Sequence, residues 1–558
     1  MARVTGAQVL AEMLQGYGVT HVFMVPAVLR RTFAEMERRT SIRRIHTHGE
    51  KAAAYMADGF ARASGRPGVC MAQVVGALNL AAGLRDAWLA HSPVIAFTGG
   101  REAKNKFRGV YQEVDDMPSF EPVTKWNATV DAVERFPDMV RHAFRMAVSG
   151  SPGPVHLQFR GNEGQVDQDE ADMEVLCEAQ FARVPAFRPE PDAESVRAAL
   201  GLLQSAQKPV IVAGGGVRAS GAARELVALA EKLQVPVATS LNGKDSIPAA
   251  HPLSVGVVGT YSRESANRVV AAADLVCFVG SETGGMTTHF WAVPKPGVAA
   301  IQIDIDATAL GRNYPLKAAV NGDAKVTLAR MLEGADASTA VGRASWLSTV
   351  RGLCDEYAAK YRGLLESDAV PIRPERICAE LSRHLPNDAI VVVDTGHAGM
   401  WMGGMYDLKG ADQAYLRSAG HLGWAFPAGI GAKCACPERP VVTFTGDAGL
   451  WYHIAEIETA VRWGVNAVTV VNNNGSGNQS KRGFDRAYGG EQTQQARELW
   501  TFNPMNFARL AEDMGALGLR VEKAADFAPA LARALEAKRP VVIDVVTDID
   551  ALAPLAVA

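Results

Sequence analysis

Two apolar runs in the last third of the chain each lead directly into oxygen-bearing side chains. The first run, 441–444, is followed by Gly446, Asp447, Ala448 and Gly449; the second, 467–471, is followed by Asn472, Asn473, Asn474, Gly475 and Ser476. Apolar spacing between the runs predicts a helix that ends at Gly464. Such a β-α-β unit would bring Asp447 and Asn474 together at the carboxyl edge of a parallel sheet, where these sheets bind ligands.

The oxygens at this edge predict a metal site. A carboxylate, an amide oxygen and a backbone carbonyl suit Mg²⁺, which prefers oxygen ligands and often holds phosphate groups as well. We therefore predict that Asp447, Asn474 and Ser476 bind Mg²⁺ beside a diphosphate. The alternative is that both stretches are ordinary turns, since glycine, aspartate and asparagine favour turns.

Composition excludes several functional classes. The chain has 558 residues, of which 48% are hydrophobic and 21% charged, with a net charge of −3. There is no basic excess to indicate nucleic-acid binding, and no apolar run reaches the roughly 20 residues of a membrane span. The first residues do not resemble a signal peptide. We expect a cytoplasmic protein whose seven cysteines are reduced, buried and structural.

Three similar segments predict three α/β domains. Apolar runs that begin at Pro93, Pro209 and Pro440 each lead into glycines, with helical stretches between them. We predict three parallel sheets flanked by helices, in an N-terminal domain at 1–180, a central domain at 191–345 and a C-terminal domain at 372–558. The polar, weakly periodic stretches near 163–191 and 347–374 are expected to be linkers.

Glu50 is a second candidate for chemistry. The stretch 42–69 predicts a strand, a turn at Gly49 and an alanine-rich helix that begins with Glu50. An acidic residue in the first turn also stabilises a helix through its dipole, so position alone does not distinguish catalysis from capping. A third element, 389–401, is expected to be a strand followed by a polar loop.

Together these segments resemble the thiamin-diphosphate-dependent enzymes of the acetolactate synthase, benzaldehyde lyase and benzoylformate decarboxylase family. The stretch from Gly446 to Asn474 resembles that family's GDG…NN signature, with Ala448 in place of a glycine, and HTHGEKAAAYMADGFARASGRPGV resembles its N-terminal block. The resemblance implies pyrimidine-binding, central and diphosphate-binding domains in that order. It also implies thiamin diphosphate and Mg²⁺ as cofactors.

The resemblance assigns roles to individual residues. Glu50 is expected to hydrogen-bond the aminopyrimidine ring, Leu422 to stand as a wedge between the two cofactor rings, and Gln112 to lie near the reacting carbon. Further cofactor contacts are expected from Gly396, His397, Gly446, Asp447, Ala448, Gly449, Asn474, Ser476 and Gly477. The substrate is expected to meet His421, Trp451, His453 or Gln479, although each of these could be an ordinary loop residue. Residues 480–495 could form a lid.

Three features favour a carboligase among these enzymes. Residues 109–126 resemble the FQEVD…PVTKH block of acetolactate synthases, Leu29 replaces a histidine of benzaldehyde lyase, and the histidine pair of pyruvate decarboxylases is missing near 112–115. We expect a lyase or transferase acting on 2-oxo acids, aldehydes or 2-hydroxy ketones. The alternatives are a non-oxidative 2-oxo acid decarboxylase, a 2-hydroxyacyl-CoA lyase, which the short apolar C-terminus disfavours, and an inactive binding or regulatory paralogue.

The resemblance also implies partners. It predicts a homodimer or homotetramer in which Glu50 of one subunit meets Asp447 and Asn474 of another. FAD in the central domain is possible but not favoured: a lone glycine run at 213–222 is weak evidence for a nucleotide, and 284–286 lacks an arginine. Close packing of a helix on the sheet explains such glycines equally well.

Overall fold

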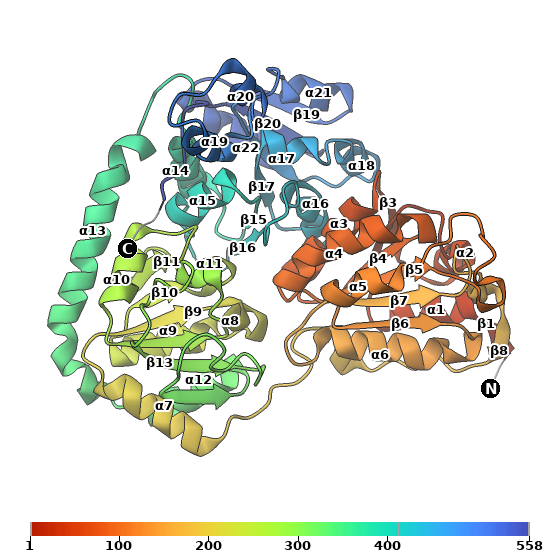
Figure 1. Ribbon diagram of the computed structural model, residues 1–558, viewed down its shortest axis with the longest axis horizontal. Coiled ribbons are helices and arrows are strands. Elements are labelled where there is room, and N and C mark those ends of the chain that lie inside the picture. Colours follow the sequence, from red (N-terminus) through yellow and green to blue (C-terminus); the bar gives the residue numbers. More distant parts are fainter. Residues whose placement is uncertain (1–2, 411, 556–558) are drawn as a thin grey trace.

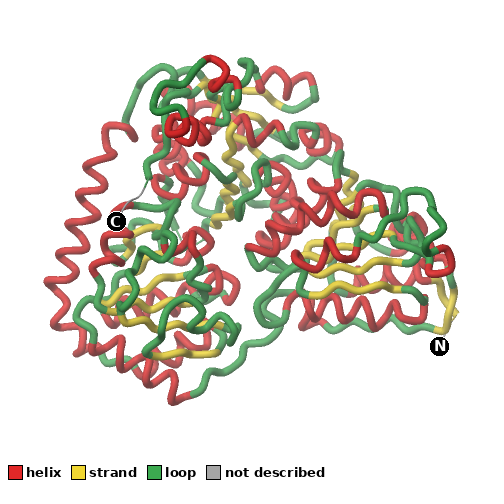
Figure 2. Tube along the Cα trace, in the orientation of Figure 1, coloured by secondary structure: helices red, strands yellow, loops and turns green. Residues whose placement is uncertain are grey.

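The computed structural model describes residues 3–410 and 412–555, which form three α/β units (Figure 1). Each unit contains a six-stranded sheet whose strands are all parallel, and helices lie on both faces of the sheets (Figure 2). The predicted fold class is therefore confirmed. The three sheets fall within the three ranges proposed for the domains, whose outer boundaries stay a prediction.

The N-terminal sheet has the strand order β3-β2-β4-β5-β7-β6. Its strands are β2 (His21–Met24), β3 (Arg43–His46), β4 (Gly68–Ala72), β5 (Val94–Gly99), β6 (Trp126–Val130) and β7 (Val155–Phe159). Its helices are α1 (Gly6–Gly16), α2 (Arg30–Arg39), α3 (Glu50–Ser64), α4 (Ala77–Leu89), α5 (Met117–Phe120) and α6 (Phe136–Val148). Outside the sheet, β1 (Arg3–Thr5) pairs antiparallel with β8 (Glu170–Asp172).

The central sheet has the order β11-β10-β9-β12-β13-β14. Its strands are β9 (Pro209–Ala213), β10 (Val237–Thr239), β11 (Ser254–Val257), β12 (Leu275–Val279), β13 (Ala299–Asp304) and β14 (Ala318–Asn321). Its helices are α7 (Ala193–Ser205), α8 (Gly215–Ser220), α9 (Ala223–Leu233), α10 (Glu264–Ala272), α11 (Gly285–Thr288) and α12 (Ala324–Gly334).

The C-terminal sheet has the order β16-β15-β17-β18-β20-β19. Its strands are β15 (Ile390–Val393), β16 (Ala414–Arg417), β17 (Val441–Gly446), β18 (Val468–Asn473), β19 (Leu517–Val521) and β20 (Val541–Val546). Its helices are α14 (Pro374–His384), α15 (His397–Met405), α16 (Ala425–Ala435), α17 (Asp447–Trp451), α18 (Glu456–Arg462), α19 (Lys481–Ala487), α20 (Gln494–Glu498), α21 (Phe507–Asp513) and α22 (Phe527–Glu536).

Burial on both faces explains why these strands are continuous apolar runs. In β17, Val442 and Phe444 pack into the core shared with α14 and α15. Val441 points to the opposite face and packs against α16. Each strand therefore stays apolar until the sheet ends, and the first polar side chains appear at its carboxyl edge.

Helices α3 and α16 join the N-terminal and C-terminal units by direct backbone contact. A Cβ atom on Gly59 of α3 would lie 2.0 Å from the carbonyl oxygen of Ala428, and a Cβ on Gly431 of α16 would lie 1.9 Å from that of Met56. Each helix thus offers a glycine where the other helix's backbone passes. No larger residue fits at either position unless the helices separate.

The structure corrects the second predicted linker and one predicted loop. Residues 347–374 lie largely in α13 (Ala344–Leu365), a 22-residue helix that runs along the edge of the molecule (Figure 1). Residues 397–401, expected in a polar loop, begin helix α15. The prediction missed α13 because the helix is mostly exposed, yet Trp346, Val350 and Tyr361 mark its buried face. The stretch 163–191 contains only β8 and short 3₁₀ turns.

The prediction that all cysteines are buried was wrong. All seven are free thiols, and Cys70, Cys277, Cys378 and Cys434 are buried, but Cys177 is exposed and Cys354 and Cys436 are half-buried. Among the described residues, no helix combines the length and apolar character needed to cross a bilayer.

The contact between α3 and α16 predicts a steric effect of a single methyl group. Gly59→Ala should cost about 1–3 kcal/mol of stability, because the new Cβ overlaps a backbone oxygen that cannot rotate away. The matched control is Gly201→Ala in α7, where a Cβ meets nothing within 4 Å and where alanine should be neutral or stabilise the helix. Thermal unfolding compares the two; equal midpoints would contradict this account of the interface.

Candidate active site

The predicted metal residues meet at the carboxyl edge of the C-terminal sheet. Strands β17 and β18 are parallel neighbours, with Gly446 opposite Asn472. Asp447 Oδ2 accepts a hydrogen bond of 3.0 Å from the backbone N–H of Ser476. The Ser476 hydroxyl donates to Asn474 Oδ1 at 2.8 Å. The structure therefore brings Asp447, Asn474 and Ser476 into one group, which we call the metal cluster after its predicted role.

The asparagine run divides into two roles. Asn473 donates to the carbonyl oxygen of Met505 and to Asp544 Oδ1, both at 2.8 Å, so it holds the sheet together. Asn474 Oδ1 instead accepts from the hydroxyl of Ser476, whose backbone N–H bonds Asp447. Of these two adjacent asparagines, Asn474 is the one whose side chain is available to a ligand at this edge.

The alanine that departs from the family signature fits its position. Ala448 lies in the first turn of α17 and is not among the residues with positive φ. A methyl group there costs no backbone strain. Gly449 is different, because a Cβ would lie 2.7 Å from Asp394 Oδ2. Packing therefore requires glycine at Gly449, the residue after the signature, and not at 448.

The electrostatics of Asp447 fit a cation. Its side chain is only 2% exposed, and its hydrogen bonds come from backbone N–H groups of Ala448, Gly475 and Ser476. No lysine or arginine forms an ion pair with it in the described part of the chain. Burial raises the pKa of Asp447 to about 7. A divalent cation would supply the missing positive charge, and the all-oxygen donor set suits Mg²⁺.

The second predicted cofactor segment caps α15. Gly396 has φ +69°, and a Cβ there would lie 2.5 Å from Gln479 Oε1. His397 is buried, and burial lowers its pKa to about 4. Its Nδ1 bonds Asn478 Oδ1 at 2.8 Å, while the Asn478 amide donates to the carbonyl oxygen of Ala551. His397 is thus neutral with the proton on Nδ1.

Gln479 reaches a residue of the central unit. Its Nε2 donates to the Tyr261 hydroxyl at 3.3 Å, and Tyr261 also packs against the position of Gly399. Gly477, in contrast, uses its N–H to bond the carbonyl oxygen of Trp500 at 2.7 Å. Tyr261 therefore lies beside the predicted site, although its sequence context gave no motif to identify it.

Leu422 lies on the loop 418–423, which we call the wedge loop. The leucine is 41% exposed, and the next residue, Gly423, donates its N–H to Asp394 at 3.1 and 3.2 Å. Asp394 also accepts from the Thr445 hydroxyl at 2.8 Å, just before the metal cluster. Burial raises the pKa of Asp394 to about 7. This carboxyl group thus links the predicted wedge to the predicted diphosphate site.

Glu50 belongs to a separate group on the N-terminal unit. It begins α3, as predicted, and accepts a hydrogen bond of 3.2 Å from Asn79 Nδ2. A Cβ on Gly76 would lie 2.4 Å from Glu50 Oε1, so the glycine is needed beside the carboxylate. Gln112 lies on a loop and accepts from Gln73 at 3.2 Å. Glu50–Asn79 and Gln73–Gln112 are therefore two hydrogen-bonded pairs of the N-terminal unit, connected through the turn in which the N–H of Gly76 bonds the carbonyl oxygen of Gln73.

The four predicted substrate residues do not form one cluster. His421 Nδ1 bonds the Tyr55 hydroxyl at 2.6 Å, and the His453 ring meets the Tyr55 ring edge-on with centroids 5.4 Å apart. Burial lowers the pKa of both histidines, that of His453 to about 4. Trp451 instead packs edge-on against Phe507. The histidines are thus neutral neighbours of Tyr55, while Trp451 and Gln479 lie elsewhere.

Within the described residues, no hydrogen bond or ion pair joins Glu50 to Asp447 or Asn474. The contacts of Glu50 lie on the N-terminal unit, and those of the metal cluster lie on the C-terminal unit. One chain therefore presents two separate groups of predicted site residues, which we call half sites, each with its own set of polar partners.

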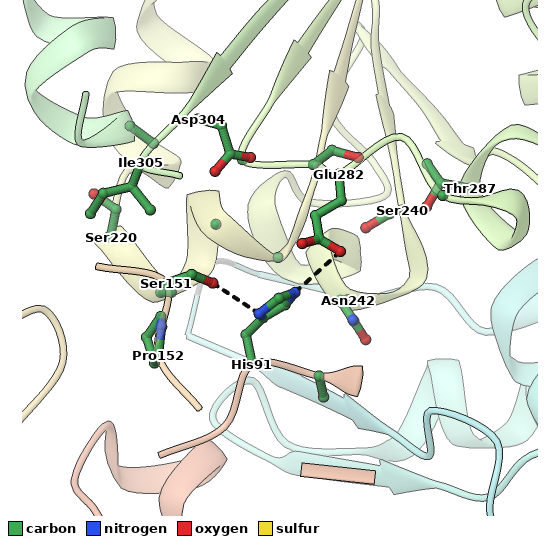
Figure 3. Close-up of a pocket in the computed structure, with 18 of the residues that line it drawn as sticks. His91, Ser151, Pro152, Ser220, Ser240, Asn242, Glu282, Thr287, Asp304 and Ile305 are labelled. Atoms are coloured by element: carbon green, nitrogen blue, oxygen red, sulfur yellow. Dashed lines mark hydrogen bonds and ion pairs between the residues drawn. The ribbon is translucent and has the colours of Figure 1, made fainter. Parts of the chain in front are cut away.

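A separate cavity of about 340 Å³ lies between the N-terminal and central units. His91 crosses it, bonding the Ser151 hydroxyl at 2.8 Å and approaching Glu282 at 3.5 Å (Figure 3). The glycine run borders it, but a Cβ on Gly214 would lie 2.0 Å from the carbonyl oxygen of Gly280, and one on Gly216 would lie 2.6 Å from its Cα. Close packing of two loops is therefore sufficient to explain these glycines.

Comparison with known proteins agrees with this architecture. Three family models match the chain in order: the N-terminal TPP binding domain of thiamine pyrophosphate enzymes at 4–119, their central domain at 196–331 and their C-terminal TPP binding domain at 394–545.

Relatives match nearly the whole chain. A protein of Methanocaldococcus jannaschii named "Probable acetolactate synthase large subunit" is 31% identical, over 97% of this chain and 92% of the relative. The acetolactate synthase large subunit of Corynebacterium glutamicum is 30% identical, over 98% and 88%. The sulfoacetaldehyde acetyltransferase of Alcaligenes xylosoxydans xylosoxydans is also 30% identical, over 96% and 91%. The chain therefore belongs to the thiamine pyrophosphate enzymes and is a thiamin-diphosphate-dependent enzyme of the acetolactate synthase type.

Proposed function

We propose that this enzyme is a Mg²⁺-dependent carboligase that makes or breaks the C–C bond of a 2-hydroxy ketone, using 2-oxo acids or aldehydes as partners. Relatives over nearly the full length support this proposal, because the names of two describe synthesis of acetolactate and one describes transfer of an acetyl group.

Side chains of the N-terminal unit carry the choice of reaction. Asn79, Gln73 and Gln112 are amides, which can hydrogen-bond a carbonyl group but cannot deliver a proton at neutral pH. Leu29, which stands where a histidine would be expected in a benzaldehyde lyase, is fully buried and apolar. A surface of this kind orients a second carbonyl substrate better than it releases a free aldehyde.

The chain's residues would divide the work of catalysis. Thiamin diphosphate, when bound, supplies the electron sink that lets a bond beside a carbonyl carbon break or form. Glu50 would hold a proton against the pyrimidine ring, and Leu422 would fix the angle between the rings. Asp447, Asn474 and Ser476 would hold Mg²⁺, which neutralises the diphosphate. Gln112 would orient the substrate carbonyl.

We infer that the working site needs two subunits. Glu50 and the metal cluster are separate within one chain, and a second copy could place its Glu50 opposite the wedge loop. Exposed apolar side chains support such contact on both half sites: Val75 and Leu78 lie near Glu50, while Leu422 and Tyr452 lie near the C-terminal site. The dimer or tetramer would then be a condition for activity.

The second candidate is simple decarboxylation of a 2-oxo acid. His421 directly precedes Leu422, and His453 lies beside the same Tyr55 ring. If either imidazole reached the reacting carbon, it could deliver the proton that releases an aldehyde.

We further propose that the cavity between the N-terminal and central units holds no tightly bound flavin. The glycines that border it, Gly214 and Gly216, are explained by close packing of two loops.

The products formed from pyruvate or benzoylformate distinguish the two candidates. With an acceptor aldehyde present, a carboligase yields a 2-hydroxy ketone, and it should also cleave acetoin or benzoin. We expect acyloin formation, measured by chromatography with carbon dioxide recorded separately. Free aldehyde as the sole product would favour decarboxylation, and cleavage of a 2-hydroxyacyl-CoA would move the enzyme to the acyl-CoA lyases.

Glu50→Gln tests the catalytic carboxyl group. Glutamine keeps the shape and the bond to Asn79 but cannot exchange the proton, so turnover should fall by about 100-fold or more while the cofactor still binds. Glu134→Gln, an exposed position of the same unit, is the control and should match wild type. Activity of the Glu50 variant within about threefold of wild type would return this residue to helix stabilisation.

Asp447→Ala tests the metal site. The remaining neutral oxygens cannot offset the charge of a diphosphate, so Mg²⁺-dependent cofactor binding should be lost. Asp513→Ala, which removes an exposed carboxylate of α21, should bind normally. Equilibrium dialysis of thiamin diphosphate with and without a chelator measures both. Retention of the cofactor by chelated wild-type protein would show that the cofactor is held by contacts that do not involve a metal at Asp447.

A further inference from the structure

The wedge loop has little regular structure of its own. It joins β16 to α16, and two of its residues, Gly420 and Gly423, have φ of +149° and +80°. A glycine-containing loop of this kind samples many conformations unless other groups fix it. Inside the loop, the Ser418 hydroxyl bonds the carbonyl oxygen of His421 at 2.8 Å and accepts the N–H of Gly420 at 3.2 Å. The position of Leu422 relative to the rest of the protein depends on contacts from outside the loop.

Asp86 of helix α4 supplies contacts on one side of the loop. Its carboxylate accepts the backbone N–H of Ala419 at 2.9 and 3.0 Å and the backbone N–H of His421 at 3.3 Å. It also faces the Ser418 hydroxyl at 3.1 Å. Three positions beside the wedge, 418, 419 and 421, thus bond one side chain that lies more than 300 residues earlier in the chain.

The surroundings of Asp86 keep it an acceptor. The side chain is buried, and Arg62 donates to its Oδ1 at 2.8 Å and to its backbone carbonyl at 3.2 Å. Arg62 also bonds Asp58 and the carbonyl oxygen of Arg417. Since Arg62 is already shared with Asp58, the second carboxylate remains able to receive the loop's N–H groups. Charge-assisted bonds of this type are stronger than neutral ones.

Asp394 holds the other side of the loop at Gly423. The two carboxylates come from different units, because α4 belongs to the N-terminal sheet and β15 to the C-terminal sheet. Between them lies Leu422, which contributes to neither bond and projects outward. The loop is therefore clamped across the interface between the N-terminal and C-terminal units.

We propose that Asp86 is a positioning residue that sets the place of Leu422 by holding the backbone of the wedge loop. This inference rests on the proposed function for the role of Leu422 as the wedge. The same helix carries Asn79, which bonds Glu50, and the two residues are separated by about 10 Å of helix. Helix α4 therefore supports one half site at its N-terminal end and the other at its C-terminal end.

Asp86→Asn is the direct test. An asparagine side chain has only one acceptor oxygen, so it cannot accept from Arg62 at one atom and from the loop at the other. Either Arg62 or a backbone N–H of the loop loses its partner, and both losses weaken the hold on the loop. Hydrogen exchange of the cofactor-free protein, read by mass spectrometry on peptides covering 418–423, should become about tenfold faster or more. Asp138→Asn, an exposed position of α6 that pairs with Arg135, should leave this exchange unchanged.

Ser418→Ala is the milder variant, in case the Asp86 variant folds poorly. It removes the bond to Asp86 together with the two bonds that the same hydroxyl makes inside the loop, to the carbonyl oxygen of His421 and from the N–H of Gly420, and it leaves the Arg62 network intact. Hydrogen exchange of the Ser418 variant should become faster in the peptides that cover 418–423 and should stay unchanged in all other peptides. With the holoenzyme, both variants should lower kcat while KM changes little, because a displaced wedge impairs chemistry more than substrate binding.

The two measurements separate this proposal from the proposed function. Faster exchange at 418–423 together with at least a tenfold loss of kcat in the Asp86 variant supports positioning. Unchanged exchange, or kcat within about twofold of wild type, overturns it. If wild-type protein shows no thiamin-dependent turnover, the proposed function fails, and the exchange of the cofactor-free protein alone decides whether Asp86 holds the loop.

Discussion

The close contact between α3 and α16 is the constraint on which the candidate site depends. With glycines at 59 and 431, the two helices approach until backbone meets backbone, and a single Cβ on either would collide with a carbonyl oxygen. This approach brings charged residues of α3 under the C-terminal unit: Trp424 Nε1 donates to Asp58 at 2.9 Å, and the Arg62 guanidinium lies 4.4 Å from the Trp424 ring centroid. If the helices separated, Asp58 would lose its bond to Trp424, and Arg62 would lose its contact with the Trp424 ring.

Buried charge is tolerated here because it is paired. Asp58, Arg62 and Asp86 form one connected set, and the energetic cost of burying each ion is offset only while all the bonds are made. Asp447 and Asp394 differ, since both are buried without an ion-pair partner among the described residues, and burial raises the pKa of each to about 7. Asp447 and Asp394, which have no ion-pair partner, lie where a cation and a cofactor are expected. Asp58 and Asp86, which pair with Arg62, lie on the N-terminal unit, and Asp86 bonds the wedge loop.

The sequence was sufficient to predict the sheets and the polar edge, because parallel strands buried on both faces appear as apolar runs and their ends are marked by Gly446-Asp447 and Asn474. Glu50 was found through a motif that extends along a whole helix. Helix α13 was missed because its buried face is sparse, and Asp86, Asp394 and Tyr261 were missed because their partners are remote in sequence. Nothing in the neighbouring sequence distinguishes Asp86 from any other aspartate on a helix. Its role becomes visible only through its hydrogen bonds with residues 418–421.

The positions of these missed residues follow from how the chain is divided. Asp447 and Glu50 were found because each lies in a motif of its own unit that resembles a known family, and such a motif can be identified without the other unit. Residues that hold one unit against another have only to fit this chain's own interface, and many side chains can meet that requirement. Asp86 accepts hydrogen bonds from Ala419 and His421, and the Tyr261 hydroxyl accepts one from Gln479. The chemistry of the site can thus be inferred from motifs, whereas the geometry that places Leu422 relative to Asp447 depends on contacts that only the folded chain brings together.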